Sequence, residues 1–232
     1  MKISWWSRIL DFISPRLCVV CGERLAVTER TLCACCTLHL PYTAYQFTPT
    51  DNPMCQLLWK LSRVERAAAL LHYEPRSELA AVVYQLKYGD RPDIGEDMGA
   101  LMGRELQRAH FLDGIDVLVP VPLTWWREQQ RGYNQSERLA VGISDVTGLP
   151  IARKALRRKR FLQTQTHLNR QERQENVSDM FELRDGRQVE GRHVLLVDDI
   201  CTTGATLTAC ANALSAVPGV RVSVCTLGLT KS

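Results

Sequence analysis

The chain of 232 residues lacks any apolar run of the roughly eighteen residues that a transmembrane helix requires. Its amino-terminal segment also lacks the unbroken apolar stretch of a secretion signal, because Ser7, Arg8 and Asp11 interrupt it. The interrupted pattern favours a short amphipathic helix that packs against the protein's own core over one that anchors to a membrane. We therefore expect a cytoplasmic protein without stable membrane insertion.

A strong excess of one charge is lacking as well. The formal net charge is +4, which permits an anionic ligand but does not require a nucleic acid. Apolar residues make up 45% and charged residues 23%, the usual balance of a folded globular chain. The length suits one medium domain and one small module. We place a helix and a cysteine-rich zinc module at 1–45 and the main domain at 46–232.

Cysteine, by contrast, is abundant, with nine in all and five of them between Cys18 and Cys36. Without a secretion signal, metal ligation or burial explains them better than disulfides do. Two cysteine pairs on tight turns can supply four thiolates to one tetrahedral Zn²⁺ in a closed, structural site. The predicted ligands are Cys18, Cys21, Cys33 and Cys36. Cys35 fits the spacing poorly and is a spare thiol, and a redox-active pair or unliganded cysteines are the alternatives.

The segment from His193 to Thr208 carries the strongest pattern in the chain. An apolar run, Val194 to Val197, is typical of a central strand of a parallel sheet, and Asp198 and Asp199 follow it. Next comes a turn rich in hydroxyls, and then a helix whose N-terminal N–H groups can bind a phosphate. The carboxylates suit ribose hydroxyls or a metal ion, and an ordinary βα turn is the alternative. The predicted phosphate loop consists of Thr202, Thr203, Gly204, Ala205 and Thr206.

Basic residues follow a second predicted strand at 114–122. Arg127, Arg131 and Gly132 come after its carboxyl end, which is where α/β sheets bind ligands. The planar guanidinium group holds phosphate oxygens in pairs. We interpret this segment as a second part of the anion site, and the alternative is a solvated basic turn before the helix predicted at 136–146.

Apolar spacing predicts further helices at 54–61, 77–88 and 94–111, and strands at 66–73, 154–156 and 220–229. The stretch 177–183 is interpreted as a strand or a turn. The polar segment 43–53, which contains two prolines, is interpreted as a linker. Lys87 closes the helix at 77–88, where a lysine suits the helix dipole. The basic segment 157–176 is interpreted as a mobile lid or a nucleic-acid contact, with a solvated face as the alternative.

The stretch from Val194 to Thr206 resembles the phosphoribosyl-pyrophosphate (PRPP) loop of type I phosphoribosyltransferases. The whole chain resembles the ComF family of phosphoribosyltransferase-like proteins, which includes bacterial competence and DNA-utilisation proteins. Besides the loop and the cysteine pairs, the resemblance rests on the stretches 86–88, 119–123 with 131–135, and 165–168 with 170–181. The chain departs from some relatives by having no second cysteine cluster, and from many by having His167 at a position where they have a small residue.

The resemblance implies an α/β fold of the type I phosphoribosyltransferase kind, with a mostly parallel sheet flanked by helices. PRPP would lie over the carboxyl ends of the strands with Mg²⁺ bridging its oxygens. Asp198 and Asp199 would hold the ribose hydroxyls and form the catalytic centre, and residues 202–206 would hold the 5′-phosphate. The implied pyrophosphate-binding residues are Lys87, Arg127, Arg131 and Gly132.

Two classes of function agree with these patterns. One is an enzyme that transfers the phosphoribosyl group of PRPP to an acceptor and releases pyrophosphate. The other is a binding protein, either a sensor of PRPP or a nucleotide, or a single-stranded DNA-binding protein that works with DNA-uptake proteins. A fold that keeps the loop but has lost its activity is a third interpretation.

Overall fold

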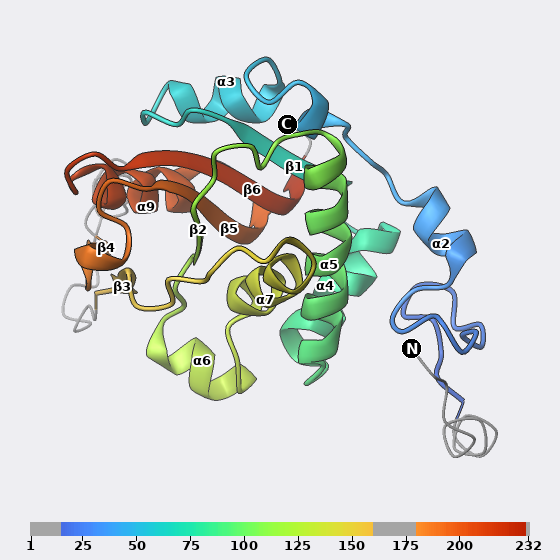
Figure 1. The fold of residues 1–232 in the computed structure, drawn as a ribbon. Helices are drawn as coiled ribbons and strands as arrows, with labels where there is room; N and C mark the ends of the chain where they lie inside the picture. Colours follow the sequence, from blue (N-terminus) through green and yellow to red (C-terminus); the bar gives the residue numbers. More distant parts are fainter. Residues whose placement is uncertain (1–14, 160–179, 231–232) are drawn as a thin grey trace.

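The structure is a computed structural model that describes residues 15–159 and 180–230 (Figure 1). The expected amino-terminal helix and most of the basic segment 157–176 lie outside these residues. Within the described ranges, no helix combines the length and the apolar character needed to cross a bilayer.

Four parallel strands form the central sheet in the order β1, β6, β5, β2 (Figure 1). Their bounds are Ala67–Tyr73 for β1, Val117–Pro120 for β2, His193–Cys201 for β5 and Arg221–Thr230 for β6. Their apolar runs are buried on both faces, as expected for parallel strands that are covered by helices on each side. The sheet confirms the predicted α/β class.

Helices cover the two faces of this sheet in separate layers. One layer, with Leu86, Met98 and Leu139 in its core, contains α4, α5 and α7. The other, with Leu58 and Leu207, contains α3, α9 and a small antiparallel hairpin of β3 and β4. The bounds are Pro53–Trp59 for α3, Glu78–Tyr88 for α4, Pro92–Arg108 for α5, Gln135–Thr147 for α7, Leu156–Arg158 for β3, Phe181–Leu183 for β4 and Ala205–Ser215 for α9.

Two glycines allow α5 and α7 to cross in contact. A Cβ atom on Gly99 would lie 2.1 Å from the carbonyl oxygen of Leu139, and one on Gly142 would lie 1.9 Å from that of Glu96. Both distances are shorter than any Cβ contact, so neither position accepts a side chain without separating the helices. This crossing holds the N-terminus of α7 beside the sheet.

The connections of β2 and β5 leave the sheet in opposite directions. From β2 the chain passes through α6 (Trp125–Arg131) and α7 to Ile151, which forms a parallel bridge with Leu118 on the outer side of β2. From β5 it passes through α9 to β6, on the other side. Adjacent strands whose connections diverge form the crevice in which open α/β sheets bind ligands. The fold therefore creates a crevice at the carboxyl ends of β2 and β5.

The structure corrects three expectations from the sequence. The segment 43–53 is not a free linker, because it contains the 3₁₀ turn Tyr45–Phe47 and buries Asn52, whose Nδ2 donates to the Ala67 carbonyl at 2.8 Å. The strand predicted at 154–156 lies at β3 instead, and α6 occupies a segment for which no helix was predicted.

The amino-terminal module contacts the main domain through side chains and backbone. Its short helix α2 spans Ala34–His39. In the main domain, a 3₁₀ turn, η2, spans Gly186–Gln188 before β5. Thr31 donates through Oγ1 to the carboxylate of Asp97 in α5, and Tyr42 forms an antiparallel bridge with Leu71 of β1.

Candidate functional site

Asp198 and Asp199 occupy the crevice between β5 and β2. Strand β5 continues through both residues, so their side chains point to opposite faces of the sheet. Asp198 is 9% exposed, and its Oδ1 accepts from the Ser136 hydroxyl at 2.8 Å and from the Asp199 N–H at 2.9 Å. Because Ser136 lies in the first turn of α7, this hydrogen bond fixes the helix start to the acidic pair.

Burial raises the pKa of Asp198 to about 7, and the adjacent charge of Asp199 adds to this effect. The hydrogen bond from Ser136 favours the ionised form and only partly offsets the rise. A carboxyl group whose pKa lies near neutrality, in a crevice with a specific charged neighbour, is typical of a functional site.

Lys87 lies beside Asp199 rather than at a free helix end. Its Nζ is 2.8 Å from Asp199 Oδ2, and both side chains are mostly buried. The end of α4 is held in place by Tyr133, whose hydroxyl donates to the Leu86 carbonyl at 2.7 Å. Residues far apart in the sequence thus form one side of the crevice.

The predicted phosphate loop connects β5 to α9, and it opens with exposed hydroxyls. Thr202 and Thr203 are exposed, while Gly204 is buried in a left-handed conformation with φ of 76°. Among the described residues, no side chain caps α9 or α5, whereas Asn52, Ser77, Thr124 and Asn134 cap α3, α4, α6 and α7. The Thr203 hydroxyl approaches the first N–H of α9 at 3.5 Å. The N-terminus of α9 therefore keeps N–H groups for an external anion.

A basic helix, α6, adjoins the start of α7. Arg127 and Arg131 are four residues apart on it and share a face, and Gly132 ends it with φ of 75°. The Arg131 Nη1 donates to Gln135 Oε1 at 2.8 Å, and its guanidinium lies 5.4 Å from the centre of the Tyr88 ring. These contacts link α6 to the end of α4, next to Lys87.

Gln135 offers a further hydrogen-bond donor at this point. Its side chain is 1% exposed, and its Nε2 has no partner within the part of the chain that the structure describes. A buried donor without a partner carries a cost of about 1–3 kcal/mol unless something satisfies it.

Sequence reasoning missed Ser136 and Arg158 as parts of this site. Ser136 looked like an ordinary helix start, and Arg158 looked like one of many basic residues in the segment 157–176. Arg158 is instead half-buried in β3, where burial lowers the pKa of its guanidinium, and the nearby charge of Asp198 opposes that effect. The signal in the sequence was the pair of apolar residues Leu156 and Phe181. Both are buried in β3 and β4, and the Arg158 guanidinium lies over the Phe181 ring.

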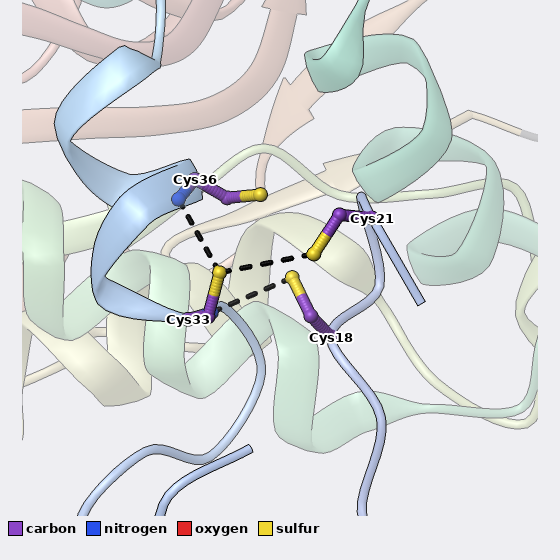
Figure 2. Close-up of side chains that lie close together, drawn as sticks. All are labelled: Cys18, Cys21, Cys33 and Cys36. Carbon is purple, nitrogen blue, oxygen red and sulfur yellow. Dashed lines mark hydrogen bonds between the residues drawn. The ribbon is translucent and has the colours of Figure 1, made fainter. Parts of the chain in front are cut away.

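The four predicted zinc ligands form one cluster, with their sulfur atoms within 4.8 Å of one another (Figure 2). The Cys21 and Cys33 sulfurs are 3.8 Å apart. That separation agrees with two corners of a tetrahedron whose metal–sulfur bonds are about 2.3 Å. Backbone N–H groups of Cys33 and Cys36 donate to sulfurs of Cys18 and Cys33, at 3.4 and 3.3 Å. The cluster therefore fits a divalent metal that prefers tetrahedral thiolates.

Cys35 lies outside this cluster. Its Sγ faces the His39 Nδ1 at 3.8 Å on the exposed side of α2. Burial opposes ionisation of Cys18, yet the backbone N–H groups of Cys21, Cys33 and Val20 outweigh it and lower its pKa to about 7. Burial and the neighbouring thiols raise the pKa of Cys36 instead. A metal ion that binds all four thiolates would offset the unfavourable burial and mutual repulsion of these thiolates. Its binding would release protons from the thiols.

Residues 122–229 match the model of the phosphoribosyl transferase domain, and the match covers β5, the phosphate loop and α9. A curated relative, DNA utilization protein YhgH of Escherichia coli O157:H7, is 31% identical over 201 residues, which is 85% of this chain and 83% of the relative. The chain belongs to the ComF family. Membership confirms the predicted phosphoribosyltransferase fold, in which the acidic pair and the loop lie at the strand ends.

Two other ComF relatives extend this similarity. Competence protein F of Haemophilus influenzae is 27% identical over 212 residues, which is 86% of this chain and 90% of the relative. Competence protein ComFC of Bacillus subtilis is 32% identical over 98 residues, covering 42% of this chain and 38% of the relative.

Proposed function

We propose that this ComF protein binds PRPP together with Mg²⁺ in the crevice between β2 and β5, and transfers the phosphoribosyl group to an acceptor. The observation that carries this proposal is the uncapped N-terminus of α9, which follows a few residues after an acidic pair whose first member, Asp198, is buried. A helix N-terminus favours the 5′-phosphate, and carboxylates accept hydrogen bonds from the ribose 2′ and 3′ hydroxyls. Both groups of PRPP thus find partners of matching chemistry on one βα turn.

The pyrophosphate has basic partners on the neighbouring elements. Lys87 lies 2.8 Å from the acidic pair, so it reduces the repulsion that a polyanion would meet there. Arg127 and Arg131 lie on one face of α6, and Gly132 leaves the backbone accessible. We assign these four residues to pyrophosphate binding, with Gln135 as an additional donor.

The acidic pair also fits Mg²⁺, which takes oxygen ligands and is usually held by one or two carboxylates plus substrate phosphates. Asp198 and Asp199 would supply the carboxylates. When bound, Mg²⁺ neutralises negative charge that develops on the departing pyrophosphate.

The reaction forms a bond between the acceptor and C1′ of the ribose while the bond from C1′ to the pyrophosphate oxygen breaks. The electron pair of the broken bond leaves with pyrophosphate, and the acceptor loses a proton. Positive charge develops on the ribose, next to the carboxylates, and negative charge develops on the leaving group, next to Lys87 and the arginines. With a pKa near 7, Asp198 is able to hold or release a proton at neutral pH.

Titration calorimetry with PRPP and Mg²⁺ tests the binding step. We expect saturable binding to the wild type and none to the double variant Asp198→Asn with Asp199→Asn. The matched control is Asp93→Asn, which removes an equally charged side chain at the start of α5 and should leave binding unchanged. A wild type that does not bind PRPP in Mg²⁺ contradicts the proposal.

Pyrophosphate release separates the enzyme from the sensor. A panel of nucleobases and amines is incubated with PRPP and the protein, and release that depends on one acceptor establishes transfer. Binding of PRPP without release by any acceptor would instead favour the non-catalytic sensor.

The relatives named for DNA utilization and competence suggest that this chain acts in the uptake or use of DNA. We expect a strain that lacks it to grow poorly on DNA as a carbon source or to transform poorly. Complementation with the double aspartate variant should fail if the phosphoribosyl site is needed. If the variant complements fully, a contact with single-stranded DNA or with DNA-uptake proteins is the better explanation.

For the cysteine cluster we propose one structural Zn²⁺. The tetrahedral sulfur spacing and the four thiolates support this choice over Mg²⁺ or Ca²⁺, which prefer oxygen ligands. Metal analysis of the purified protein should give one zinc per chain.

A further inference from the structure

A second hollow lies at the opposite end of the sheet from the acidic pair. Two adjoining cavities of about 570 and 560 Å³ open between the end of α3, the end of α9 and the start of β6. This size is within the range of about 300–1,000 Å³ that is typical of small-molecule sites. We call it the Trp59 cleft, and its walls include Trp59, Ser62, Arg63, Glu65, Ser215 and Arg221.

The aromatic wall of the cleft is fixed in place. The Trp59 indole N–H donates to the Val64 carbonyl at 2.6 Å, while 46% of the residue stays exposed. The loop that follows is tied to the sheet, because the Glu65 N–H donates to the Val222 carbonyl at 2.8 Å. A flat ring that binds here would therefore meet an ordered indole, and little conformational entropy would be lost.

Positive charge dominates the rim. Within the described residues, neither Lys60 nor Arg63 has an acidic partner, and both are exposed. Arg221 lies 3.6 Å from Glu65, so one of the three cations of the cleft is already paired. The two remaining charges suit a small anionic group such as a phosphate, whereas the Ser62 hydroxyl in the same wall already donates to the Leu58 carbonyl at 3.3 Å.

The cleft is separate from the crevice that we assign to PRPP. Helix α9 connects the two sites, with Gly204 at its N-terminus in the crevice and Ser215 at its C-terminus in the cleft. Eleven residues of helix span about 16 Å. Ligands in the two places would therefore not overlap.

We propose that the Trp59 cleft is a second binding site for a small ligand that combines a flat aromatic ring with a phosphate, as a nucleotide does. The ring packs on Trp59, and Arg63 and Lys60 bind the phosphate. This site goes beyond phosphoribosyl binding, and it stands whether or not the crevice binds PRPP.

Calorimetric titration of the full chain with AMP tests the proposal, with adenosine and inorganic phosphate as partial probes. We expect saturable AMP binding, weaker binding of each partial probe, and an AMP affinity that saturating PRPP leaves unchanged. Arg63→Gln and Trp59→Leu should each weaken AMP binding by roughly tenfold or more, as loss of a charged or stacking contact does.

Two controls decide where AMP binds. Arg104→Gln, which removes an exposed arginine from α5, should bind AMP like the wild type. The double variant Asp198→Asn with Asp199→Asn should also bind it normally. Loss of AMP binding in the double variant would place the nucleotide in the crevice and overturn the proposal, as would unchanged binding in Arg63→Gln or no binding of AMP by the wild type. Arg63 is exposed, so that variant folds even if Trp59→Leu does not.

Discussion

The substitution Asp198→Asn should stabilise the unliganded protein at neutral pH while it weakens the PRPP site. The carboxamide oxygen of the variant can still accept from the Ser136 hydroxyl and the Asp199 N–H, so the hydrogen bonds remain. The buried negative charge disappears, and with it the repulsion from Asp199. Active sites commonly trade stability for function in this way.

The size of the effect follows from the pKa of Asp198, which rises from its ordinary 3.8 to about 7 on folding. A folded-state pKa above the unfolded value means that the native state binds more protons, so the free energy of unfolding falls as pH rises from about 4 to about 7. The whole loss is roughly 4 kcal/mol, of which about 2 kcal/mol falls between about pH 5.5 and pH 8. The variant has no such loss.

The assay is thermal unfolding of both proteins at these two pH values, with zinc content checked at each. At each pH we take the Tm of Asp198→Asn minus that of the wild type. This difference should be larger at the higher pH by roughly 4–8 °C, because the effect is about 2 kcal/mol and each kcal/mol corresponds to about 2–4 °C in a chain of this size. Asp93→Asn is the control, because Arg91 holds the pKa of Asp93 below its usual value and its contribution is therefore constant across this window. A Tm difference for Asp198→Asn that does not change with pH would refute the reasoning.

Three further predictions concern the zinc cluster, the phosphate loop and the lysine beside the acidic pair. Cys36→Ser should lose zinc and lower the Tm, whereas Cys35→Ser should keep both, as metal analysis and thermal unfolding will show. Gly204→Ala should lower the unfolding free energy by about 1–2 kcal/mol, because φ is positive there and a Cβ would lie 3.1 Å from a leucine of α3. The same substitution should weaken PRPP binding. Lys87→Met should leave Asp199 without its cation and weaken PRPP binding by more than tenfold in titration calorimetry.

Local patterns in the sequence predicted most of the elements and the parallel sheet. Short apolar runs such as Val194 to Val197 are typical of central strands, and apolar residues at helical spacing identified α4, α5 and α7. The four cysteines of the sulfur cluster were also identified by spacing alone, because two pairs on tight turns have few ways to meet. These features depend on neighbours in the chain, which the sequence displays directly.

The chain order also predicted the two halves of the anion site, but not how they meet. That Lys87 contacts Asp199, that Ser136 binds Asp198, and that Arg158 lies near the same carboxylate all depend on how α4, α7 and β3 pack around the strand ends. The segment 43–53 looked like a linker for the same reason, since its polar residues are buried against β1 only after folding.

The sequence by itself therefore determined which side chains the predicted phosphate loop and the cysteine cluster present, because each is built within one short stretch. Only the tertiary structure decided the raised pKa of Asp198, since the burial that raises it comes from residues far apart in the chain. It also decided that α9 connects the crevice to the Trp59 cleft, whose walls come from three separate segments. Contacts of this kind depend on packing in three dimensions, which no local pattern records.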